Sequence, residues 1–416
     1  MKVSFLTMKQ LIVITLFIFF AVFAHSAECQ IRTVRCFPLG HPEAEPVIEL
    51  GSGQQLVFSF DDLSADDHTY TYKILHCDPD WNPSGLSPFR YLDGFFSQPV
   101  EDYAYSYHAD TEYTHFSLLF PNHETGIKVS GNYLLQVYDD DRPDSAVISQ
   151  RFSVLERKTV IHGSVVSATR PQYLYTSQQV NFTVENGSLP VYNPVRDFRV
   201  HVTQNQDPNT RRALTPTFVR QGQLVYEDGV ENLFDGLSPF RHFQTVSFAF
   251  YDRYVKEVVK GPDGKYHFIL EPATVPQRYV PVADERGNYV IDAEQVQQPD
   301  VEADYAMVHF ALLYPEPLPD AEVYVYGKFS GWELSPAFRM DYDARHKAYI
   351  CDVELKQGRY DYQFAVLDKT TGEVDLHTLQ NNFYQTINEY NVRIYFYDSA
   401  LGAYRFVGYQ NIIPTF

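Results

Sequence analysis

GNYLLQVYDDDRPD, residues 131–144, combines the two signals that decide the fold of this chain. Residues 131–138 alternate, with Tyr133, Leu135 and Val137 on one side, which is the period of a half-buried β-strand. The polar run 139–144 that follows is typical of a turn. This pattern of a short alternating strand closed by a turn recurs along the chain and predicts an all-β protein. Further strands are predicted at 55–60, 69–74, 114–120, 151–155, 179–184, 198–202, 246–250, 265–270, 305–313, 322–327, 360–366 and 392–397.

Composition and length indicate several β-domains. The 416 residues include 32 Tyr, 31 Phe and 25 Pro, and aromatic side chains fit the pleated surface of a strand better than a helix face. At about 100–150 residues per domain, the chain has room for roughly three domains. We therefore predict three tandem immunoglobulin-like β-sandwiches, of the E-set or fibronectin-like kind, at 27–156, 157–300 and 301–416. The irregular, proline-containing stretch 272–281 is expected to be an ordered surface loop.

The N-terminus has the pattern of a secretory signal peptide. Lys2 and Lys9 supply a basic segment, residues 11–24 form an apolar run, and small residues surround a cleavage position before Ala27. We therefore expect residues 1–26 to be removed and the mature chain to be exported to the periplasm. The apolar run is short for a membrane anchor, because a spanning helix needs about 20 residues.

The mature chain would keep four cysteines: Cys29, Cys36, Cys77 and Cys351. Export makes disulfide bonds possible, but the spacing does not determine whether these cysteines pair or how. A lipid anchor at Cys29 is disfavoured because Glu28 stands where a lipobox has a small residue. The spacing also lacks the CxxC pairs of a zinc site.

The acidic charge excludes several classes of partner. The chain has 33 Lys and Arg against 53 Asp and Glu, which gives a formal charge of −20. Binding to nucleic acid needs clustered Lys and Arg, and so does docking on an anionic lipid surface. After the N-terminal run, no segment has 18 uninterrupted apolar residues, so no direct lipid span is expected.

The hexapeptide GLSPFR occurs twice, at 85–90 and at 236–241. A duplicated domain would explain the repeat, but the flanking sequences do not match. Coincidence or a shared style of loop explains it equally well. The repeat therefore does not by itself support a common origin of the first two predicted domains.

A series of longer motifs follows the chain in order. Together they resemble the plug protein family of the type IX secretion system, and this resemblance spans almost the whole mature chain. The motifs are HCDPDW at 76–81, YLDGF at 91–95, SGNY at 130–133, TQN at 203–205, FRHF at 240–243, YVYGKF at 324–329 and LKQGRYDY at 355–362.

The resemblance implies a periplasmic protein that is not an enzyme and needs no cofactor. Its expected partner is the large outer-membrane translocon barrel, whose periplasmic opening it would close by reversible protein–protein binding. The chain has no G-x-S-x-G or H-E-x-x-H motif, and we predict no catalytic, cofactor-binding or metal residues. Asp139, Asp140 and Asp141 offer oxygen ligands for calcium, but they lack the spacing of a known loop, so a solvated turn is the preferred interpretation.

The loop 78–96 concentrates aromatic residues among prolines and glycines. Aromatic side chains on loops are favoured anchors of protein interfaces, although such residues also cap the core of a sandwich. We predict that part of this loop contacts the translocon. The candidate residues are Trp81, Phe89, Tyr91, Phe95 and Phe96.

GKFSGW, residues 327–332, resembles a turn of glycogen- and starch-binding sandwich modules. In such modules a tryptophan face and polar neighbours bind sugar. Lys328, Phe329 and Trp332 match the turn, but Gln363 and Val374 stand where the modules have a lysine and a second tryptophan. We therefore interpret the turn as vestigial and keep a carbohydrate-binding protein as the alternative function. A glycoside-active enzyme would need a cleft with two carboxylates about 5–10 Å apart.

Overall fold

The computed structural model describes residues 31–64, 67–220 and 222–415. Strands dominate, so the predicted all-β class is confirmed, while the predicted signal peptide and Cys29 lie outside the described residues. No helix within the described ranges is long and apolar enough to cross a membrane. The α-helices are single turns with proline in their first turn, where its missing N–H costs nothing. The helical turns are α2 (Pro88–Tyr91), α3 (Pro194–Asp197), α4 (Pro299–Glu302), η1 (Pro171–Tyr173), η2 (Lys328–Ser330) and η3 (Pro336–Phe338).

The first sandwich has two main sheets, with strand orders β1-β3-β8-β7 and β2-β11-β10-β4-β6, and β5 and β9 pair separately as a two-stranded sheet. Because side chains alternate between the two faces of a strand, Phe58 and Phe60 of β3 point toward Tyr133 and Leu135 of β10. These residues belong to one buried core between the sheets. The strands are β1 (Ile31–Pro38), β2 (Val47–Glu49), β3 (Leu56–Asp62), β4 (Tyr70–Cys77), β5 (Leu92–Gly94), β6 (Ser97–Pro99), β7 (Asp102–Tyr105), β8 (Thr114–Phe120), β9 (Thr125–Ile127), β10 (Gly131–Asp139) and β11 (Arg142–Leu155).

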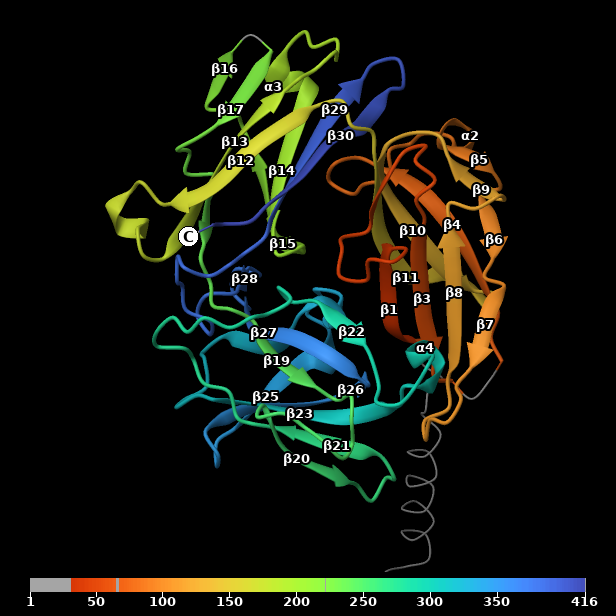
Figure 1. Ribbon diagram of the computed structural model, residues 1–416, viewed down its shortest axis with the longest axis vertical. Coiled ribbons are helices and arrows are strands. Elements are labelled where there is room, and N and C mark those ends of the chain that lie inside the picture. The colour runs from red at the N-terminus through yellow and green to blue at the C-terminus, as the bar shows by residue number, and fades with distance from the viewer. Residues whose placement is uncertain (1–30, 65–66, 221, 416) are drawn as a thin grey trace, which may run out of the picture.

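The second sandwich joins strands from the middle and the end of the chain. One sheet has the order β12-β13-β17-β16, with β18 also paired to β13, and the other has the order β15-β14-β29-β30. β29 pairs with β14 from Phe198↔Phe396 to Gln204↔Tyr390. Figure 1 shows β29 and β30 in blue beside β14 in green. The strands are β12 (Val160–Ser167), β13 (Ser177–Glu185), β14 (Phe198–Gln204), β15 (Asp207–Leu214), β16 (Phe218–Arg220), β17 (Gln223–Tyr226), β18 (Leu233–Asp235), β29 (Tyr390–Asp398) and β30 (Ala403–Ile412).

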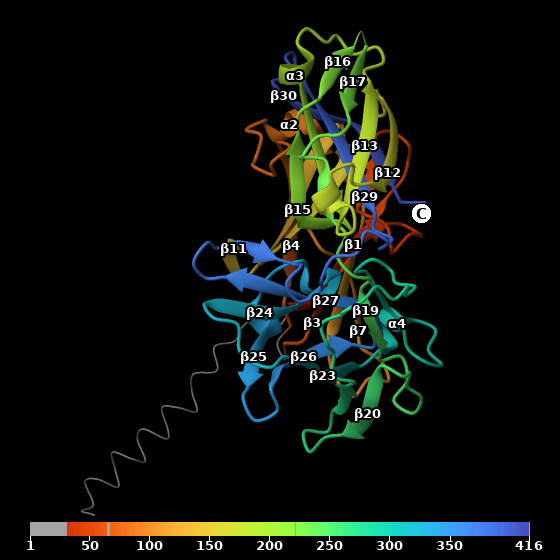
Figure 2. The ribbon, with the colours of Figure 1, turned by 90° about the vertical axis from the view of Figure 1, so that its left-hand side faces the viewer.

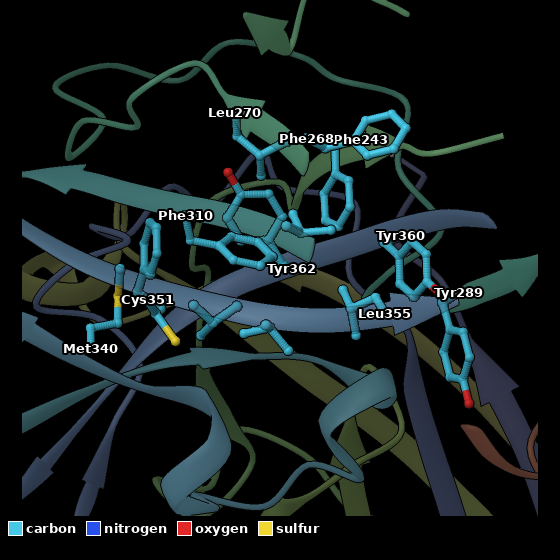
Figure 3. Close-up of a cluster of buried hydrophobic side chains, with 14 of the residues drawn as sticks. Phe243, Phe268, Leu270, Tyr289, Phe310, Met340, Cys351, Leu355, Tyr360 and Tyr362 are labelled. Atoms are coloured by element: carbon cyan, nitrogen blue, oxygen red, sulfur yellow. The ribbon is translucent and has the colours of Figure 1, made fainter. Parts of the chain in front are cut away.

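The third unit is one ten-stranded sheet that bends around its own core. Its order is β19-β27-β24-β25-β26-β23-β21-β20, with β22 and β28 also paired to β27. β25 turns the corner, because it pairs with β24 at Met340 and with β26 at Asp341. Phe243, Phe310 and Tyr362 meet in the enclosed core (Figure 3). The strands are β19 (Arg241–Gln244), β20 (Val255–Lys260), β21 (Tyr266–Leu270), β22 (Tyr289–Ile291), β23 (Tyr305–Leu313), β24 (Ala321–Tyr326), β25 (Arg339–Asp343), β26 (Ala348–Lys356), β27 (Gly358–Asp368) and β28 (Val374–Asp375).

The strand pairing differs from the linear division predicted at 157–300 and 301–416. β19 to β22 belong to the third unit and β29 and β30 to the second sandwich, so the third unit is inserted in the chain of the second. In Figure 2 the second sandwich lies above the third unit. An alternating pattern determines which side chains are buried but not which strand lies alongside, and this is why the division was misplaced.

One predicted strand is wrong. The backbone at 246–250 is irregular, because β19 ends at Gln244, and Phe248 instead stacks on Tyr266 with ring centroids 3.9 Å apart. The stretch 272–281 is irregular as predicted, with a single bridge from Ala273 to Leu312. The immunoglobulin-like strand topology of each unit stays a prediction.

A buried carboxylate joins the first sandwich to the third unit. Asp61 of β3 has no exposed surface. It accepts hydrogen bonds of 2.6 Å from the Lys356 Nζ, from the Tyr305 hydroxyl and from Nδ1 of His115. Burial opposes ionisation of Asp61, but the hydrogen bond from His115 and the charge of Lys356 outweigh it and hold its pKa below the usual value. Three donors from two units therefore converge on one charge.

A second junction joins the first sandwich to the second. Arg393 of β29 is 7% exposed and forms an ion pair with Glu45, which precedes β2. Beside it, Leu155 of β11 packs with Tyr395 and Phe406 in a small apolar cluster. Charge and apolar packing together hold the C-terminal hairpin against the first sandwich.

The second sandwich also meets the third unit through buried polar groups. Oδ1 of Asp207, in β15, accepts a 2.8 Å hydrogen bond from the Tyr326 hydroxyl. Asn209 Nδ2 donates to the Trp332 carbonyl at 2.8 Å. Each of the three units is therefore joined to the other two by contacts that exclude water.

The Asp61 junction predicts a large loss of stability on removal of its cation. Lys356→Met leaves a buried carboxylate without its ion-pair partner, so we expect a cost of about 3–5 kcal/mol in the free energy of unfolding measured with urea. Arg157→Met is the matched control, because Arg157 and Glu49 form an exposed ion pair of 3.4 Å; it should cost less than about 1 kcal/mol. Equal costs for the two variants would contradict the role given to Asp61.

Candidate partner interface

The outer edge of the first sandwich is built from the chain between β4 and β8. β6 is the edge strand of one sheet and β7 the edge strand of the other, so both open edges lie on the same side. Figure 1 shows α2, β5, β6 and β7 along this side of the molecule. Gly94 makes the path possible: its φ is +102°, and a Cβ there would lie 1.9 Å from the Glu124 carbonyl oxygen. The close approach of Gly94 to Glu124 fixes the backbone path of the next two residues, Phe95 and Phe96.

The structure divides the five predicted interface residues. Phe89, Phe95 and Phe96 are 84%, 64% and 41% exposed. Tyr91 is buried, and its hydroxyl donates to the Ile74 carbonyl at 3.2 Å. Trp81 is half-buried below the Arg151 guanidinium, 5.0 Å from its ring centroid. Three of the five residues can therefore contact a partner without rearrangement, and Tyr91 belongs to the core.

Two exposed tyrosines on β7 extend this surface and were not predicted. Tyr103 and Tyr105 are 57% and 62% exposed, and their ring centroids lie 5.9 Å apart. The signal was in the sequence, because DYAYSY at 102–107 places a tyrosine at every second position. We call Phe89, Phe95, Phe96, Tyr103 and Tyr105 the aromatic edge.

The glycan-type turn is buried. Trp332 is 7% exposed, and its indole packs against Tyr326 and Phe240 with ring centroids 5.2 and 6.3 Å away. Lys328 Nζ is used internally, donating to Asn288 Oδ1 at 2.7 Å. Phe329 packs beside the main core of the third unit. The turn therefore offers no open tryptophan face to a sugar, and its backbone forms part of the junction with the second sandwich.

Two buried carboxyl groups near this junction have strongly raised pKa values. Burial raises the pKa of Asp207 to about 7, and burial with the nearby charge of Asp284 raises the pKa of Asp361 to about 7. Such shifts are common at catalytic sites. Here, however, Asp361 Oδ2 accepts the Glu285 and Gly287 N–H groups, and Asp207 Oδ1 accepts the Tyr326 hydroxyl. These carboxyls organise loops between the units.

Among the described residues, the aspartate turn holds one group of three His, Cys, Asp or Glu side chains whose ligand atoms lie close enough together to bind a metal ion. His68, Asp139 and Asp141 place ligand atoms within 4.8 Å of one another. Asp139 Oδ2 also accepts hydrogen bonds from Nε and Nη2 of Arg142, at 3.1 and 3.0 Å. A guanidinium thus already neutralises the buried carboxylate, which favours the interpretation as a structural turn. The three described cysteines, Cys36, Cys77 and Cys351, are buried and free.

Comparison with known proteins places the aromatic edge in a recognised domain. Residues 31–156 match the family model described as the type 9 secretion system plug protein 1st domain. The chain is also similar to the crystal structure of a hypothetical protein from Parabacteroides merdae, with 31% sequence identity and a TM-score of 0.88. That likeness covers 92% of this chain and 97% of the other, so it includes all three units. No curated protein matches the sequence significantly.

The raised pKa of Asp207 predicts a pH-dependent stability. The folded chain binds this proton more tightly than the unfolded chain, whose aspartates titrate near 3.9. The contribution of Asp207 to stability therefore falls as the pH rises from about 4 to about 7. Asp207→Asn removes this titration, so the loss of melting temperature between pH 5 and pH 8 should be smaller than in the wild type. An identical loss in both proteins would contradict the assignment.

Proposed function

Because this chain belongs to the plug protein family of the type IX secretion system, we propose that it closes the periplasmic opening of the translocon barrel by reversible protein–protein binding. Membership of the family points to a role in type IX secretion and to a location in the cell envelope. The barrel as partner, and gating as the role, are the proposal. This function requires a surface that binds a protein and a body that moves as one piece.

The aromatic edge is the observation that supports the binding surface. Its side chains are 41–84% exposed and lie on the helical turn α2, on the loop after β5 and on the edge strand β7. Aromatic side chains bury about 150–250 Å² each and are enriched among the residues that dominate binding energy. A standard interface buries about 1,200–2,000 Å² in total. The aromatic edge is therefore large enough to form the apolar centre of such an interface.

The junctions between the units support the second requirement. Asp61, Arg393 and Asp207 each lie in a contact that buries polar groups between two units. Breaking such a contact leaves charges or hydrogen-bonding groups without partners, and no gain in free energy from apolar surface compensates for that loss. A solvent-facing edge is easier to detach than these junctions. Release of the whole body from its partner is thus favoured over separation of its units.

The binding surface can be tested by co-purification with the translocon barrel. We expect a Phe89→Ala, Phe95→Ala, Tyr103→Ala triple variant to lose capture of the barrel while keeping the wild-type melting temperature. Tyr192→Ala and Phe250→Ala are matched controls, since these rings are 87% and 75% exposed on the other two units. Undiminished capture by the triple variant would refute the aromatic edge as the binding surface.

Gating itself is tested in cells. A strain that lacks the protein should admit small molecules through the outer membrane, and the wild-type gene should restore the barrier. The triple variant should fail to restore it, whereas the Tyr192→Ala control should succeed. Normal permeability in the deletion strain would remove the gating role, even if the protein still binds the barrel.

A further inference from the structure

Two histidines on the outer face of the third unit point their rings at each other. His267 lies on β21 and His309 on the neighbouring strand β23, which run parallel. Nδ1 of His267 is 2.8 Å from Nε2 of His309, the ring centroids are 5.1 Å apart, and the rings are nearly parallel at 14°. Both side chains are partly open to solvent, 19% and 28% exposed.

Each histidine also has a carboxylate at its outer nitrogen. Nε2 of His267 is 3.0 Å from Asp263 Oδ1, and Nδ1 of His309 is 2.7 Å from Asp352 Oδ1. The turn that carries Asp263 depends on Gly261, where a Cβ would lie 2.3 Å from Nε2 of His267. The hydrogen bond from His267 lowers the pKa of Asp263. The result is a continuous carboxylate–imidazole–imidazole–carboxylate chain across three strands and a turn.

The chain of contacts requires a positive charge between the rings. A hydrogen bond at each of the three contacts needs an N–H group, and two neutral imidazoles supply only two. The inner contact is therefore made only when the pair carries an additional proton. With that proton absent, two imidazole lone pairs face each other, and a cation is the species that fits between them.

We propose that His267 and His309 bind one divalent transition-metal ion, Zn²⁺ or Cu²⁺, through their inner nitrogens. Metal-bound histidines commonly donate their other N–H to a carboxylate, which fixes the ring and strengthens the ligand. Asp263 and Asp352 already occupy those positions. Two nitrogens on a tetrahedral zinc ion lie about 3.3 Å apart, so the inner nitrogens need to separate by only about half an ångström. Water completes the coordination on the exposed side.

Bound metal would link β20 and β21 more firmly to the rest of the sheet. β21 pairs with β23 over only three residue pairs, from His267↔Met307 to Ile269↔His309. A ligand that binds the folded chain and not the unfolded one raises the melting temperature. This inference does not depend on the plugging role, because the site lies on the third unit and not on the aromatic edge.

Calorimetry with the full chain and ZnCl₂ tests the site. We expect one saturable zinc ion per chain, lost in His267→Ala and in His309→Ala. His346→Ala is the matched control, because His346 also contacts an aspartate, Asp343 at 2.6 Å, on the same unit; it should keep binding. Asp352→Asn should weaken binding about tenfold through the positioning of His309. Wild-type binding in both alanine variants would overturn the proposal.

A spectroscopic readout needs no variant and so is independent of folding defects. Cu²⁺ added at one equivalent to the wild-type chain should give an electron paramagnetic resonance spectrum with coupling to two imidazole nitrogens. The ion binds imidazole more tightly than the other first-row divalent metals do. Coupling to no nitrogen, or to a single nitrogen, would contradict a shared two-histidine site.

Discussion

The pairing of β14 with β29 is the constraint on which the arrangement of the molecule depends. It places residues 198–204 beside residues 390–396 and completes one sheet of the second sandwich with the end of the chain. Val202 and Val392 then share a core with strands of the opposite sheet. The third unit, which lies between them in the sequence, is consequently held by two chain connections. Its position relative to the second sandwich is fixed at both of its ends.

Buried polar groups lie between the units of the protein, whereas exposed aromatic rings lie on the free edge of the first sandwich. The interfaces between units use charges and hydroxyls that are almost completely buried, as at Asp61 and Lys356, whereas the free edge of the first sandwich exposes Phe89 at 84%. A buried ion pair is weak as a source of net stability, but it is costly to separate. An exposed aromatic ring gains free energy only when a partner covers it. The contacts between the units are therefore specific and lasting, whereas the aromatic edge has no partner within the described part of the protein to cover it.

Sequence patterns predicted most strands but not their partners. The repeat GLSPFR shows why: the last three residues of the copy at 85–90 begin α2 with Phe89 exposed, and the copy at 236–241 leads into β19 with Phe240 4% exposed. Identical local residues adopt different structures because the surrounding strands differ. The same limit applies to the candidate site. Aromatic content marked the loop 78–96, but only tertiary packing separates buried Tyr91 from its exposed neighbours, and the alternating tyrosines of β7 were overlooked.

The insertion of the third unit sets an order in which the molecule can be assembled during synthesis. The first sandwich is complete at Leu155 and the third unit at Asp375, so each has all its strands once that point has been made. β14 exists from residue 204 onward, yet its partner β29 arrives almost 200 residues later, the largest separation in sequence between paired strands of the described part of the chain. Until then the edge of β14 stays open to wrong partners. The second sandwich is thus the last unit to complete its sheets. Truncation of the final hairpin, β29 and β30, would leave one of its two sheets incomplete.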